Sequence, residues 1–173
     1  MQRFAFRGRR VGAPQFPLPG PGRPGPRALV GKVVGGAGAS TLARLLGPAT
    51  QEIELAGLRP ASGDEPLLLV TRDTAAGTHA LLPALEQAAR LGYHRPAVVL
   101  VADGPWAPPA QARARARMLN DPARIRLLQR LPYVPGWRDL DDPLAHLTEV
   151  PRALRAPLRL IEHALHTAAG TPA

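Results

Sequence analysis

Short apolar runs that alternate with helical segments place the strongest limit on the fold of this chain. Four such runs predict strands, at 28–34, 67–71, 97–102 and 125–129. The runs at 67–71 and 97–102 are almost continuously apolar, which is typical of strands buried on both faces of a parallel sheet. Strands that alternate with helices form such sheets, with helices covering both faces. We therefore expect a small three-layer α/β domain with a parallel sheet.

Helical spacing fills the stretches between these runs. The segments 40–46 and 109–120 are expected to be helices, and another helix is expected to end at Leu91, before Gly92. Pro83 must lie in the first turn of that helix or kink it. A terminal helix is indicated by four apolar residues on one face, namely Leu154, Leu158, Ile161 and Leu165. Because ligands bind at the carboxyl ends of parallel strands, the loops that follow the strands are the places to look for a site.

Residues 1–27 differ from the rest of the chain. They contain six arginines and no acidic residue, and the stretch 14–26 is dominated by proline and glycine. Such a composition favours a disordered or polyproline arm, so we divide the chain into an arm at 1–27 and a folded domain at 28–173. The net charge of the whole chain is +9, and 16 basic against 13 acidic residues leave only +3 outside the arm. The arm is either a solvated linker or a basic segment that contacts nucleic acid, or an acidic partner, by charge alone.

Composition excludes several classes of protein. The chain has no cysteine, which rules out disulfide scaffolds and cysteine-based zinc sites or nucleophiles. No apolar run approaches the roughly 18–20 residues that a membrane span requires, and no apolar segment of a secretory signal follows the first arginines. We therefore expect a soluble, cytoplasmic protein without a membrane partner.

A glycine-rich loop between the first strand and the first helix is the most informative segment. It contains Gly35, Gly36 and Gly38, followed by Ser40 and Thr41. Glycines let backbone N–H groups turn around an anion, and the positive end of the next helix adds to the attraction. A hydroxyl at the helix start can bind magnesium, whereas the lysine that normally neutralises the phosphates is missing. The candidate phosphate-binding residues are Gly35, Gly36, Ala37, Gly38, Ala39, Ser40 and Thr41.

This loop, Gly-Gly-Ala-Gly-Ala-Ser-Thr-Leu-Ala, resembles the Gly-Gly-x-Gly-Lys-Thr-Thr loop of the partitioning-type (ParA/MinD-like) P-loop ATPases. It is most similar to the loop of an uncharacterised actinobacterial family of such proteins. Both lysines of the ATPase pattern are absent, because Val34 and Ala39 stand in their places, and Val33 replaces the first glycine of the general P-loop pattern. The resemblance implies a P-loop-like domain, ATP or ADP with magnesium as ligand, and a role in plasmid or chromosome maintenance.

Two further loops fit the same architecture. Asp103 follows an apolar run, as the magnesium-binding aspartate of a Walker B strand does, although an Asx-turn beside Gly104 explains it equally well. Asp73 is expected to cap the helix that follows it. Tyr133 and Trp137 lie in a region that is near the nucleotide base in similar proteins, and packing of the loop onto the sheet is the simpler explanation for them.

Loss of the lysine removes a charge that stabilises phosphoryl transfer, so we expect no hydrolysis. The sequence thus favours a non-catalytic, P-loop-like accessory or regulatory protein with residual nucleotide binding and an unidentified protein partner. One alternative is a nucleic-acid-associated module that uses the arginine-rich arm. Others are an ATPase completed by a lysine or arginine from a partner, and a glycine loop that is only structural and holds no cofactor.

Overall fold

The computed structural model describes residues 28–62, 65–137, 140, 142–145 and 149–168. The arm predicted at 1–27 lies outside these described residues. The elements follow one another along the chain in this order: β1 (Ala28–Lys32), α1 (Ala39–Leu46), β2 (Thr50–Glu54), a short 3-10 helix (Leu55–Gly57), β3 (Leu67–Arg72), α2 (Ala75–Arg90), β4 (Ala97–Val101), α3 (Ala110–Leu119), β5 (Leu127–Leu131) and α4 (Arg152–Ala168).

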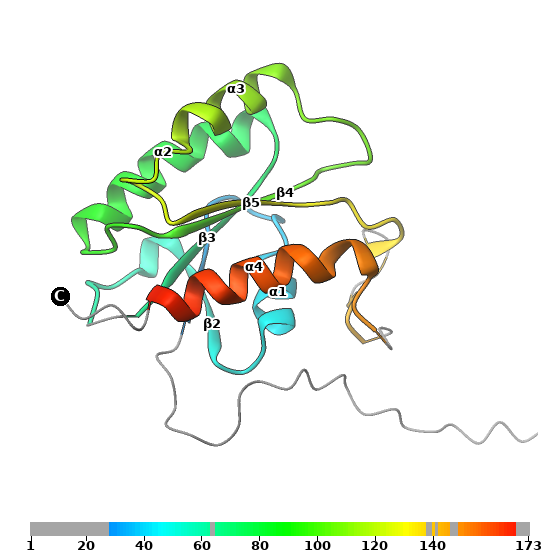
Figure 1. Cartoon of the computed structure of the whole chain (residues 1–173), viewed down its shortest axis with the longest axis horizontal. Coiled ribbons are helices and arrows are strands. Elements are labelled where there is room, and N and C mark those ends of the chain that lie inside the picture. The colour runs from blue at the N-terminus through cyan, green and yellow to red at the C-terminus, as the bar shows by residue number, and fades with distance from the viewer. Residues whose placement is uncertain (1–27, 63–64, 138–139, 141, 146–148, 169–173) are drawn as a thin grey trace, which may run out of the picture.

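The strands form one five-stranded sheet in the order β2-β1-β3-β4-β5, and every neighbouring pair is parallel. Helices cover both of its faces, with α1 and α4 on one side and α2 and α3 on the other (Figure 1). The prediction of a three-layer α/β domain with a parallel sheet is therefore confirmed.

Alternation along the strands divides the core into two halves. Val30, Leu68 and Val99 pack with α1 and α4, whereas Leu69 and Leu100 pack with α2 and α3. All five are completely buried or nearly so. Because successive side chains point to opposite faces, a strand apolar at every position fills both halves at once. The same alternation decides which face the polar residues at the strand ends will reach.

The number of strands is larger than the sequence predicted. β2 at Thr50–Glu54 is a fifth strand, and we expected only four. It was missed because it lies at the edge of the sheet, so its residues Gln51, Glu52 and Glu54 are exposed and no apolar run marks it. The last strand also begins later than expected, at Leu127 rather than at 125.

The helices agree with their predicted positions more closely. Gly47 is the C-cap of α1 and Gly92 follows α2, and both glycines have positive φ angles of 92°. The four apolar residues predicted for one face of the terminal helix are all buried in α4. Pro83, however, lies well inside α2 rather than in its first turn. Of the two alternatives given for Pro83, the first turn is therefore excluded, because α2 begins eight residues earlier, at Ala75.

Candidate functional site

The sheet reverses its winding direction between β1 and β3. From β1 the chain proceeds to β2 on one side, and then crosses to β3 on the other. In doubly wound sheets, the crevice for a ligand opens at this reversal, outside the carboxyl ends of the strands. The glycine loop follows β1, and Arg72 and Asp73 lie at the end of β3, so these segments meet at the switch point.

A pocket of about 230 Å³ opens there, and we call it the main pocket. It brings together four of the predicted loop residues with the predicted metal ligand and both predicted aromatic residues. These are Gly36, Ala37, Gly38, Thr41, Asp103, Tyr133 and Trp137. Arg72, from the end of β3, lines it as well, and Leu42, Leu45, Leu131 and Leu154 supply apolar walls. Gly35, Ala39 and Ser40 do not line this pocket.

The backbone of the glycine loop requires glycine at two positions. Gly36 and Gly38 have φ angles of 65° and 80°, which L side chains rarely adopt. Gly38 is the N-cap of α1, and the first turn of that helix contains no acidic residue. The first N–H groups of an α-helix have no partner within the helix. The positive end of α1 is therefore presented at the pocket without a side-chain cap.

Arg72 is a candidate site residue that the sequence analysis missed. Its Nε donates to the carbonyl oxygen of Gly36 at 3.1 Å, and its Nη1 donates to Oδ1 of Asp103 at 3.0 Å. The guanidinium group thus lies directly beside the glycine loop. The signal in the sequence was a lone arginine immediately after a buried apolar run. Only the strand order showed which loop it would reach.

The polar residues on the other side of the loop face away from the pocket. The hydroxyl group of Ser40 donates to Oε1 of Glu52 on β2, at 2.9 Å. Lys32 forms an ion pair with Glu54, and the hydrogen bond to that carboxylate raises the pKa of the lysine. Of the two hydroxyl residues predicted to help bind a cofactor, only Thr41 lines the main pocket.

Asp103 is separated from the glycine loop by the width of one strand, because β3 lies between β1 and β4. Arg72 spans that gap and binds its carboxylate. A magnesium ion at this position would have to share Asp103 with the guanidinium group, and the pocket is also lined by Thr41 and Tyr133, which carry hydroxyl groups. Within the described residues, no three His, Asp or Glu side chains lie close enough together to hold a metal ion.

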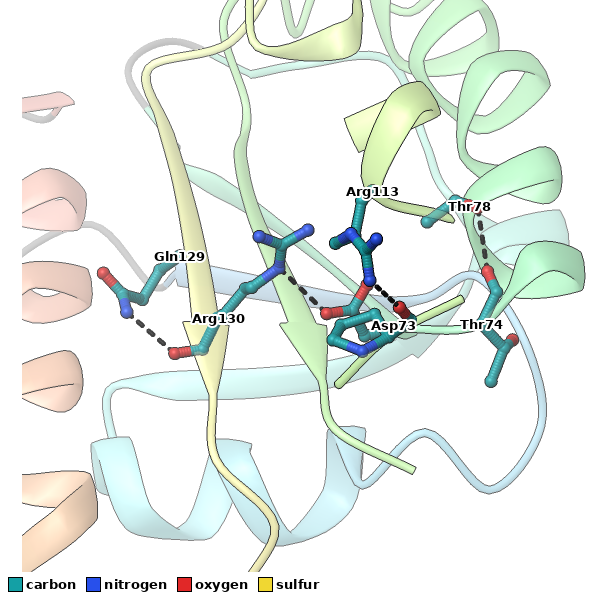
Figure 2. Close-up of polar contacts among 7 residues, drawn as sticks. Asp73, Thr74, Thr78, Arg113, Gln129 and Arg130 are labelled. Atoms are coloured by element: carbon teal, nitrogen blue, oxygen red, sulfur yellow. Dashed lines mark hydrogen bonds and ion pairs between the residues drawn. The ribbon is translucent and has the colours of Figure 1, made fainter. Parts of the chain in front are cut away.

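The prediction that Asp73 caps α2 was wrong. The N-cap is Thr74, whose hydroxyl oxygen accepts from the N–H of Gly77 at 3.0 Å. Asp73 instead points to the other face of the sheet, where its Oδ2 accepts from Nε of Arg130 on β5 at 2.9 Å (Figure 2). Its side chain is only 3% exposed. Thr74 caps the helix because it directly precedes the first turn, and the carboxylate one residue earlier is held by the cross-strand arginine.

A second pocket, of about 500 Å³, adjoins the main pocket, and we call it the side pocket. It is lined by Asp73, Thr74, the loop 102–109 and Tyr133. Three residues, Ala102, Asp103 and Tyr133, line both pockets. The two pockets thus share part of their walls at the carboxyl end of the sheet.

No protein-family model, no curated protein and no solved structure matches this chain. Among the helices that the structure describes, none is long and apolar enough to cross a bilayer.

Proposed function

We propose that this chain is a non-catalytic, P-loop-like accessory or regulatory protein that binds ATP or ADP in the main pocket. One observation supports the proposal above all others. The guanidinium group of Arg72 lies beside the glycine loop and the N-terminus of α1, in the pocket that also contains Asp103. Arg72 would supply the positive charge that the missing lysine supplies in the partitioning ATPases.

The electrostatics of the main pocket favour an anion. The N-terminus of a helix attracts negative charge through its free N–H groups and its dipole, and arginine adds a planar set of donors suited to phosphate. Arg72 is now paired with Asp103, and its side chain is 38% exposed. A bound phosphate would share the guanidinium group with Asp103, so binding would need no new cation.

The walls of the main pocket favour a ligand with a ring as well as a charge. Tyr133 and Trp137 line it together with leucines from α1 and α4. An inorganic anion would use only the glycine loop and Arg72, whereas a nucleotide would also cover apolar and aromatic surface. The combination of an anion cradle and aromatic walls therefore supports a nucleotide over phosphate alone.

The surroundings of the glycine loop support binding without hydrolysis. Phosphoryl transfer depends on positioning and on charge placed at the transferring group. Arg72 bonds to the loop backbone and to Asp103 at the same time, and Asp103 lies beyond β3 from the loop. Held in this way, neither side chain would be free to follow developing charge on a terminal phosphate. Thr41 and Asp103 are the residues that would hold magnesium, which commonly uses one or two protein oxygens together with phosphate oxygens.

The biological setting comes from the resemblance of the loop. We propose a cytoplasmic protein that acts in plasmid or chromosome maintenance, with a protein partner whose interaction responds to the bound nucleotide. Without a hydrolytic step, the interaction with the partner would respond to the nucleotide concentration and not to turnover.

Calorimetric titration with ATP and ADP, with and without magnesium, tests the proposal. Arg72→Gln should weaken ATP binding about tenfold or more, because a hydrogen-bonded charge pair with phosphate is lost. Gly38→Asp should abolish binding, since it places a carboxylate at the helix N-terminus. Arg124→Gln is the matched control, because Arg124 is exposed and lies before β5, at the opposite end of the strands. Equal ATP affinity in the wild type and in Arg72→Gln, or no binding at millimolar nucleotide, would overturn the proposal.

A further inference from the structure

Trp106 is the most exposed large apolar side chain among the described residues, at 84%. It belongs to the loop 104–109, which forms one wall of the side pocket. The indole ring stays close to its own loop, because a Cβ atom at Gly104 would lie 3.6 Å from its Cδ1. A ring so exposed gains little from packing within the folded domain, and it is well placed to cover an apolar surface that enters the pocket.

The side pocket is apolar where it is open, and most of its polar side chains are already engaged. Its volume of about 500 Å³ is in the range of ordinary binding pockets. Beside Trp106, its wall contains Tyr133 and the alanine and three prolines of the loop 104–109. Its acidic and threonine side chains form hydrogen bonds within the protein, namely Asp73 with Arg130, Thr74 with Gly77 and Asp103 with Arg72. An occupant would therefore be recognised by its apolar surface.

The charges around the side pocket favour an uncharged occupant. Nη1 of Arg113 donates to the carbonyl oxygen of Pro108 at 2.7 Å, and Nε of Arg130 donates to Asp73 (Figure 2). A cationic group in the pocket would be repelled by these two guanidinium groups, and an anionic group would be repelled by the carboxylates of Asp73 and Asp103. A neutral segment meets neither repulsion.

The arm at 1–27 contains a segment with these properties. Its residues 11–22 carry no charge, whereas its six arginines lie on either side, at 3–10 and 23–27. The neutral stretch contains Pro14, Pro17, Pro19 and Pro21, together with Phe16 and Leu18. Proline-rich segments favour the PPII conformation, lose little entropy on binding and dock in grooves lined by aromatic residues. The neutral stretch therefore matches the side pocket in charge and in surface.

The arm is also long enough to bring this stretch to the side pocket of its own chain. It joins β1 at Ala28, at the amino end of the sheet, whereas the side pocket lies at the carboxyl end, beside β4. One strand length and two strand spacings separate these points by about 20 Å. Pro17 precedes Ala28 by 11 residues, which span about 34 Å in the PPII conformation. The difference leaves length for a path around the helices that cover the sheet.

We propose that residues 11–22 of the arm dock in the side pocket of the same chain, where Trp106 covers their prolines. The contact uses the loop 104–109, of which no residue lines the main pocket. The inference therefore goes beyond nucleotide binding and does not depend on it. It gives the neutral middle of the arm a role that neither a solvated linker nor a contact by charge alone would require.

Paramagnetic broadening of NMR signals in the full chain tests this docking. Because the chain has no cysteine, Gln15→Cys provides a single attachment point for a nitroxide label within the neutral stretch. We expect strong broadening of the backbone amides of Gly104 and Ala107 and of the indole N–H of Trp106. The amide of Leu160 should be little affected, since α4 lies across the sheet from α2 and α3. The broadening should persist in about 1 M salt, where charges act over only about 3 Å.

A variant of the pocket separates docking from mere proximity of the arm. Trp106→Ala should lower the equilibrium constant for docking about tenfold, and the broadening of Gly104 and Ala107 should fall with it. Met118→Ala is the matched control, because it changes a side chain that is 82% exposed and does not line the side pocket. Since both side chains are so exposed, neither variant should disturb the fold.

A second pair of variants changes the arm and leaves the folded domain as it is. Pro17→Ser combined with Pro19→Ser removes two rings and two restraints on the backbone, so the broadening should fall as it does in Trp106→Ala. Pro24→Ser combined with Pro26→Ser is the matched control, because these prolines lie outside the neutral stretch. The control should leave the broadening unchanged.

A mixture of isotope-labelled chains without nitroxide and nitroxide-bearing chains without isotope identifies the chain that supplies the arm. Docking within one chain predicts no broadening in this mixture, and broadening of the loop 104–109 there would overturn the proposal in favour of a second copy. Equal broadening at Leu160 and in the loop, loss of the broadening in salt, or an unchanged effect in Trp106→Ala would also overturn it. None of these results depends on the ATP titrations of Arg72→Gln, so the two proposals can fail separately.

Discussion

Replacement of Gly77 by alanine sets two physical effects against each other, and the structure decides between them. Gly77 is the third residue of α2, where the helix passes the end of β3. A Cβ atom at this position would lie 2.2 Å from the backbone oxygen of Arg72 and 2.9 Å from Oγ1 of Thr71. Neither atom is the end of a flexible side chain, so the helix and the strand would have to move apart.

Helix propensity alone predicts the opposite sign, because alanine is favoured over glycine by about 1 kcal/mol inside a helix. Overpacking of a buried contact costs about 1–3 kcal/mol. The movement would also weaken the bonds from Gly77 N–H to Thr74 and from the Thr71 hydroxyl to Gly77 O, each worth about 1 kcal/mol. We therefore expect a net loss of about 2 kcal/mol in the free energy of unfolding. For a domain of this size, that corresponds to a fall of roughly 4–8 °C in Tm.

Urea unfolding and thermal melts of Gly77→Ala measure this loss. Gly57→Ala is the control, since nothing lies within 4 Å of a Cβ at Gly57 and its φ is not positive. The control should change the free energy of unfolding by less than about 0.5 kcal/mol. A Gly77→Ala protein as stable as the wild type, or more stable, would show that propensity dominates. Such a result would refute the close approach of α2 to the backbone of Arg72, on which the expected loss depends.

Three further changes have defined outcomes. Thr74→Ala removes the N-cap of α2 and should cost about 1 kcal/mol in urea unfolding, whereas Thr74→Ser should restore most of it. Gly36→Ala puts a Cβ atom 2.5 Å from Nη2 of Arg72, at a residue whose φ is 65°. It should therefore lower the free energy of unfolding by roughly 1 kcal/mol and weaken ATP binding in calorimetry. Unchanged ATP affinity would contradict the role given to Arg72. The hydrogen bond from Arg44 lowers the pKa of Asp142. The ionised carboxylate of Asp142 therefore stabilises the fold above the ordinary pKa of about 3.9, and this stabilisation is lost as the pH falls through the lowered pKa. Asp142→Asn should therefore flatten the decline in Tm below about pH 4, and an unchanged slope would refute this.

The buried part of the fold could be predicted because the residue types in a buried segment depend directly on what surrounds it. Leu67–Val70 and Ala97–Val101 are apolar at every position, and only strands covered on both faces need such sequences. The same holds for α4, whose leucines and isoleucine recur at helical spacing. β2 at Thr50–Glu54 could not be predicted, because its edge residues are largely exposed to solvent and no apolar run marks them as a strand.

The candidate site was predictable only where its residues are adjacent in sequence. The glycine loop is one continuous segment, so its conformation and its place before α1 followed from the chain itself. Arg72 and Asp103 are 31 residues apart, and Asp73 and Arg130 are 57 apart. Their meeting depends on the order of the strands, which the sequence leaves open. The assignment of Asp73 as a cap failed for this reason, since a distant arginine outcompetes a local N–H for its carboxylate.

Arg72 and Asp73 are neighbours in the chain, yet each is paired with a different strand end on a different face of the sheet. Relatives that keep this sheet should therefore change positions 72 and 103 together, and positions 73 and 130 together, while the two pairs vary independently of each other. A relative with reversed charges at positions 73 and 130 would keep this ion pair, whatever residues occupy positions 72 and 103.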